Sequence, residues 1–78
     1  MGMNSNDAFR TLSNEAIAFA SSTSLTTAKR RLALDEARRL HVAGDYSGAV
    51  SYAVLAADHT TTGAKAFIIK ASLLEHAL

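Results

Sequence analysis

The sequence predicts an all-α fold, a small antiparallel bundle of three to four helices in a single domain over residues 1–78. Alanine, which has the best helix propensity, is abundant, and the chain has no proline to interrupt a helix. Apolar residues recur at spacings of three and four, the period of a helix with one buried face. Clusters of Ser, Thr, Asp and Gly separate these periodic segments and supply the signals at which helices begin and end.

The first helix is expected over about residues 6–21. Ser5 or Asn6 can cap the free amide groups of its first turn. The Ser/Thr cluster at residues 21–24 is expected to end it, because these side chains compete for helical hydrogen bonds. One apolar stripe follows its length: Phe9, Leu12, Ala16 and Phe19.

The second helix is expected over about residues 26–43, and Gly44 is a suitable C-terminal cap. One face of this helix carries Ala33, Leu34, Ala37, Leu40 and, at its edge, His41. The opposite face is charged. Burial of the apolar face against a neighbouring helix is therefore expected.

The third helix is expected over about residues 46–59, with Asp45 as its N-cap. It is apolar around more than half its circumference, a pattern typical of a helix packed between neighbours. The sequence therefore places this helix at the centre of the core.

The fourth helix is expected over about residues 64–77, after the break at residues 60–63. It has two apolar surfaces, almost opposite each other. The first is formed by Phe67, Ile68, Ala71, Leu74 and Leu78, and the second by Ala66, Ile69, Leu73 and Ala77. The first is expected to face the core. The second either packs on the first helix or remains exposed as a contact surface.

The most specific local pattern spans about residues 30–62. Small or apolar residues at helical spacing lie on both sides of a Gly44-Asp45-Tyr46 turn. The pattern consists of Ala33, Ala37, Leu40, Gly44, Asp45, Tyr46, Ala49, Ala53 and Ala56. This pattern resembles a tetratricopeptide repeat, a helix-turn-helix unit that stacks into a solenoid. It differs from the family pattern at Ala33 and Ala53, where aromatic residues are frequent, and at Thr61, where proline is.

The resemblance implies a surface that holds another helix. Repeats of this family generally need about three units to bury a continuous core, so completion by self-association, by the first helix as a cap, or by a partner is expected. The hairpin around Gly44 also resembles, more weakly, the three-helix domains of the microtubule-interacting-and-trafficking type, which bind amphipathic helices.

Basic residues in the second helix provide an alternative, contact with nucleic acid. They are Lys29, Arg30, Arg31, Arg38 and Arg39. A solvated, self-paired face is the favoured interpretation, because Arg31–Asp35 and Asp35–Arg39 have the spacing of helical ion pairs. The third helix contains no Lys or Arg, which excludes it as the recognition helix of a DNA-binding hairpin.

The charge balance and the residue types present favour a protein without catalytic activity. The chain has 8 Lys+Arg against 7 Asp+Glu and no cysteine, which argues against a dedicated nucleic-acid binder and excludes thiolate sites. His41, His59 and His76 do not have metal-ligand spacing, and no catalytic motif is present. We therefore expect no catalytic, cofactor-binding or metal-binding residue. No signal peptide or membrane-spanning run is evident, and a cytoplasmic location is the default expectation.

The sequence therefore predicts a non-catalytic protein–protein interaction module, a small adaptor, regulator or assembly factor that binds a protein partner or itself as a homo-oligomer. The expected contact residues are Ile69, Leu73, Ala66, Ala77 and, as a secondary candidate, Tyr52.

Overall fold

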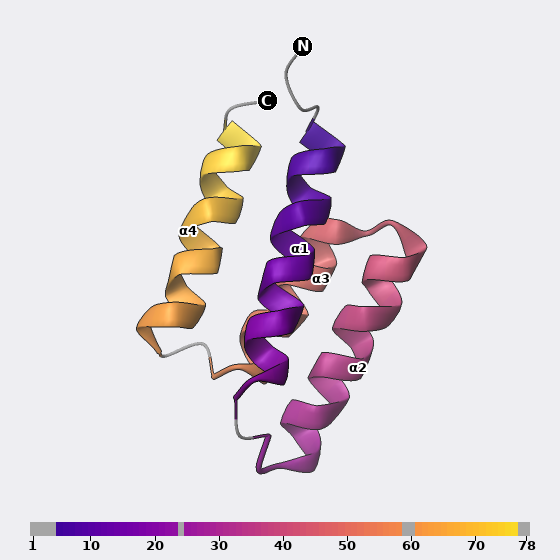
Figure 1. The fold of residues 1–78 in the computed structure, drawn as a ribbon, viewed down its shortest axis with the longest axis vertical. Coiled ribbons are helices and arrows are strands. Elements are labelled where there is room, and N and C mark those ends of the chain that lie inside the picture. Colours follow the sequence, from indigo (N-terminus) through magenta and orange to yellow (C-terminus); the bar gives the residue numbers. More distant parts are fainter. Residues whose placement is uncertain (1–4, 24, 59–60, 77–78) are drawn as a thin grey trace.

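The computed structural model describes residues 5–23, 25–58 and 61–76, and these ranges contain helices and no strand. The helices are α1 (Ser5–Ser21), α2 (Ala28–Ala43), α3 (Tyr46–Ala56) and α4 (Thr62–His76). The predicted all-α bundle of three to four helices is confirmed (Figure 1).

The helices form two layers. In Figure 1, α1 lies in front of α3, with α4 on one side and α2 on the other. α3 contacts all three other helices, and its contact with α2 is the most extensive. The Cα trace measures 42 × 26 × 16 Å, and a thickness of this size fits two layers of helices. The expectation that the third helix is the centre of the core is therefore confirmed.

The α2–α3 hairpin is built by the residues that cap its helices. Thr27 precedes α2 and its side-chain oxygen accepts a hydrogen bond from the Arg30 amide at 3.1 Å, so α2 begins two residues later than expected. Gly44 ends α2 in the left-handed conformation, with φ of 89°. Asp45 then caps α3, because its carboxylate accepts a hydrogen bond from the Gly48 amide at 3.0 Å.

α3 is shorter than the expected 46–59 and ends at Ala56. Asp58 has a positive φ of 71°, which turns the backbone out of the helical path. α4 begins at Thr62, two residues earlier than expected. The Thr61 side-chain oxygen accepts a hydrogen bond from the Ala64 amide at 3.2 Å and thereby caps its first turn.

The core is made mainly of alanine. The buried apolar residues are Leu12, Ala16, Ala20, Leu34, Ala37, Ala49, Val50, Ala53, Val54, Ala56, Ala57 and Ala64. Because alanine side chains are small, the helix backbones can approach closely. The first apolar surface of α4 is buried only in part. Phe67, Ala71 and Leu74 pack against the core, whereas Ile68, expected beside them, is 49% exposed; Leu78 lies outside the described residues.

Candidate interaction surfaces

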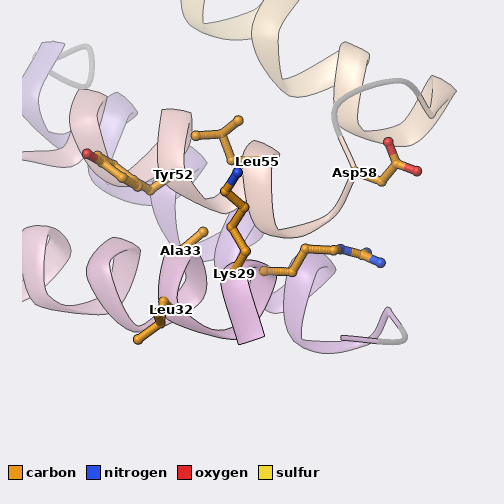
Figure 2. A pocket seen from close by; sticks show the side chains of 7 residues that line it. Lys29, Leu32, Ala33, Tyr52, Leu55 and Asp58 are labelled. Carbon is orange, nitrogen blue, oxygen red and sulfur yellow. The ribbon is translucent and has the colours of Figure 1, made fainter. Parts of the chain in front are cut away.

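An open apolar groove of about 600 Å³ lies between α2 and α3. Leu32 and Ala33 line it from α2, and Tyr52 and Leu55 line it from α3 (Figure 2). Leu32 is 67% exposed and Leu55 is 51% exposed, so these large side chains are available to a partner.

One end of this groove is charged. Lys29 and Arg30 line it from the first turn of α2, and Asp58 lines it from the segment after α3. Figure 2 shows the Lys29 side chain extending toward Leu55, with Asp58 apart from both, to the right of the view. Arg30 also holds the two helices together, because its Nε donates a hydrogen bond to the Ala56 carbonyl at 2.7 Å. The groove thus joins an apolar middle to a polar end.

The basic residues of α2 fall into two groups with different partners. Arg38 pairs with Asp35 at 3.8 Å, and Arg39 pairs with Glu36. These two pairs have i,i+3 spacing and stand in place of the predicted Arg31–Asp35 and Asp35–Arg39 pairs, which is a correction to the sequence-based interpretation. The cations in the first turn of α2 have no such acidic partner among the described residues.

Lys29, Arg30 and Arg31 form no ion pair with any carboxylate in the described ranges. Arg31 instead donates a hydrogen bond from Nη1 to the Leu25 carbonyl at 3.0 Å. The first turn of α2 contains no acidic residue. Because a helix N-terminus is already electropositive, this turn concentrates positive charge beside the groove.

The predicted contact residues of α4 are on the surface. Ile69 is 60% exposed and Leu73 is 64% exposed, and Ala66 is also exposed. Leu73 borders a second groove of about 530 Å³, between α1 and α4. Tyr52 lines the α2–α3 groove instead, so the structure does not bring it together with the α4 residues. Ala77 lies outside the described residues.

Four large apolar residues are exposed although the sequence interpretation did not place them on the surface: Leu32, Val42, Leu55 and Ile68. Ile68 and Leu55 line a third groove, of about 490 Å³, between α3 and α4. The signal that could have found Leu55 is the wide apolar arc of the third helix, because an arc of that width exceeds what two layers can cover. Leu32 lies one position before Ala33, at the edge of the buried face of α2.

A buried polar contact joins α1 to α2 and is structural. Ser13 Oγ lies 2.7 Å from His41 Nδ1, and the His41 ring packs on Tyr46 with centroids 5.1 Å apart. The Ser13 side chain is fully buried, so it is out of reach of a substrate. Its bond satisfies polar groups that would otherwise be buried without partners. His76 is exposed in the last turn of α4, and His59 lies outside the described residues.

Within the described ranges, no three His, Asp or Glu side chains are grouped so that they could hold a metal ion. None of the helices in those ranges is long and apolar enough to cross a membrane. Comparisons with protein-family models, with curated proteins and with solved structures found no match for this chain.

Proposed function

We propose that this chain is a non-catalytic protein–protein interaction module, a small adaptor, regulator or assembly factor that self-associates through α4. The observation that carries the proposal is the exposure of Ile69 and Leu73 on one face of α4, beside Ala66. Large apolar side chains grouped on the surface of a small protein mark association sites.

Two copies can share this face through a two-fold axis. In such an interface the same patch is used on both copies, so a residue contacts its counterpart or an exchanged neighbour. An antiparallel pairing of two α4 helices sets the Ile69 side chains together at the axis. It also sets the small Ala66 of one copy opposite the large Leu73 of the other, and large–small pairing permits close contact.

The energy of such a contact is modest. Burial of about 400 Å² of apolar surface contributes roughly 10 kcal/mol at about 25 cal/mol per Å². Lost rotational and translational freedom and side-chain ordering remove much of this gain, which leaves a dissociation constant on the order of micromolar. A weak, concentration-dependent dimer is therefore expected.

The resemblance of the α2–α3 hairpin to a tetratricopeptide repeat supports the same proposal. A unit of this type generally relies on stacked neighbours to complete its apolar core. The hairpin is covered by α1 in this chain, and α4 packs beside α3, so an added copy is expected to extend the bundle at α4.

The test is the replacement of Ile69 and Leu73 together by Asp. Sedimentation velocity over a wide range of concentrations should show a monomer–dimer equilibrium for the unmodified chain. The double variant should remain monomeric, because two buried charges per copy oppose contact. Val42→Asp is the matched control, since Val42 is exposed and borders none of the three grooves.

Circular dichroism separates the possible results. A helical spectrum and an unchanged unfolding midpoint in the double variant, with the dimer lost, support the proposal. Unfolding of the double variant would place Ile69 and Leu73 in the core of the monomer. A chain that is monomeric at every concentration would overturn self-association through α4.

A further inference from the structure

We infer that the α2–α3 groove binds an amphipathic helix of another protein, with that helix's acidic end against Lys29 and Arg30. The inference rests on the proposed function as an interaction module but concerns a different surface from the α4 face. It is carried by the combination of an apolar groove with two cations at one end, Lys29 and Arg30, which form no ion pair among the residues that the structure describes.

The apolar part of the groove matches one side of a helix. Leu32, Ala33, Tyr52 and Leu55 line its middle, and α2 and α3 form its two walls. A helix that enters such a groove places residues spaced three, four and seven apart between the walls. Ala33 is small and leaves room between the walls, while the exposed Leu32 and Leu55 provide contact area on either wall.

The charge at the groove end selects an acidic partner. Lys29 and Arg30 follow the N-terminus of α2 directly, where cations are locally unfavourable because the helix dipole is positive there. Asp58 at the same end offsets one of the two charges, and Arg31 in the same turn adds another. A carboxylate brought by the partner relieves this excess, whereas Arg38 and Arg39 already have acidic partners.

A second copy of this chain fits the groove poorly. The exposed apolar helix that it would contribute is α4, which also carries Lys65 and Lys70 on its surface. If α4 docked with its first turn at the basic end, it would bring Lys65 toward Lys29 and Arg30, and like charges at an interface are destabilising. In the reverse direction it would offer one carboxylate, Glu75, with a histidine beside it. The occupant is therefore a helix of a different and more acidic protein.

The test uses two synthetic helical peptides that are acetylated and amidated at their ends. Both carry Leu at helical spacings of three and four. One has Glu residues in its first turn, and its matched partner has Lys at the same positions. In a titration of the isotope-labelled chain followed by NMR, the Glu peptide should shift the amide signals of Leu32, Tyr52 and Leu55. The Lys peptide should bind about tenfold more weakly or not at all.

Two variants test the basic end and the apolar wall of the groove separately. Lys29→Glu should weaken the Glu peptide by about tenfold and strengthen the Lys peptide, because it reverses an exposed charge that has no ion pair among the described residues. Leu55→Asp should weaken both peptides by tenfold or more, since it places a charge on the apolar wall. Val42→Asp, on α2 but outside the groove, should change neither.

Three results would overturn the inference. They are no binding of the Glu peptide, equal binding of the Glu and Lys peptides, and signal shifts confined to α4. Tighter binding of a short single-stranded DNA, unaffected by Leu55→Asp, would also overturn it and assign the basic turn to nucleic acid. Self-association through Ile69 and Leu73 is measured separately by sedimentation. A failed peptide titration therefore overturns the groove inference and leaves self-association through α4 standing, whereas a monomeric chain overturns only self-association.

Discussion

At the scale of single residues, Gly63 determines how α4 meets α1. A Cβ at this position would lie 2.5 Å from Cζ of Phe19 and 2.9 Å from its Cε2. The Phe19 ring is itself held against Phe67, with ring centroids 5.6 Å apart. Glycine is therefore favoured here, because any side chain at this position would force the Phe19 ring to shift.

Gly63→Ala should lower the free energy of unfolding by about 1 kcal/mol. Overpacking typically costs about 1–3 kcal/mol, and the better helix propensity of alanine returns up to about 1 kcal/mol. Chemical denaturation measures the difference. The double variant Phe19→Leu/Gly63→Ala is the control, because a leucine side chain lacks the ring atoms that clash. A Gly63→Ala variant as stable as the unmodified chain would show that the Phe19 ring moves aside at no cost.

At the scale of elements, the α2–α3 turn is specified by neighbouring side chains acting together. Asp45 caps α3 through the Gly48 amide, and the absence of a side chain at Gly48 leaves room for that carboxylate, which would lie 2.6 Å from a Cβ. Gly44 supplies the left-handed residue between the helices. This turn fixes the antiparallel hairpin and therefore the walls of the α2–α3 groove.

Asp45→Ala should lower the free energy of unfolding by about 1 kcal/mol, the usual cost of losing an N-cap. Asp45→Asn should cost far less, because asparagine caps about as well as aspartate. Thermal unfolding followed by circular dichroism distinguishes the two variants. Equal losses in both would mean that the charge of Asp45, and not its capping hydrogen bond, stabilises the turn.

The sequence predicted the helices of this fold better than their ends. Period and cap residues were sufficient for the Gly44–Asp45 turn, because glycine and aspartate have strong local preferences. The end of α3 was missed because Asp58 has a positive φ. Aspartate adopts this conformation more often than most residues other than glycine, but too seldom for its presence in a sequence to predict a helix end. The start of α4 was predicted two residues late, because residues 60–63 together have the composition of a break, whereas the Thr61 side chain caps a helix that already includes Thr62 and Gly63.

The candidate site was predicted only in part, for a similar reason. The sequence left open whether Ile69 and Leu73 pack on the first helix or remain exposed, because the fourth helix has more apolar surface than one neighbour can cover. Both side chains are exposed in the structure. The α2–α3 groove was not predicted, because Leu32 and Leu55 belong to apolar arcs whose covered portion depends on where α1 lies. That placement is a property of packing between distant segments, which helical periodicity does not encode.

At the scale of the whole molecule, the two-layer architecture depends on small side chains at the helix contacts. Alanine provides most of the buried positions, and Val50 is the largest apolar residue that is fully buried. A core of this kind has little volume to spare, because protein interiors are close-packed. The thin bundle buries its alanines with only a few larger apolar residues, such as Leu12 and Leu34. Other large apolar residues remain at its surface: Leu32, Leu55, Ile69 and Leu73.

Ala53→Leu tests this account of the core. Ala53 is fully buried in α3, the helix that contacts all three others, so a leucine there must push the layers apart or adopt a strained rotamer. We expect a loss of about 1–3 kcal/mol in the free energy of unfolding, measured by chemical denaturation. Ala18→Leu makes the same change at an exposed position of α1 and should stay within about 0.5 kcal/mol of the unmodified chain. If Ala53→Leu were as stable as Ala18→Leu, the layers would be loosely packed, and small residues would not be the reason that the larger apolar side chains lie outside.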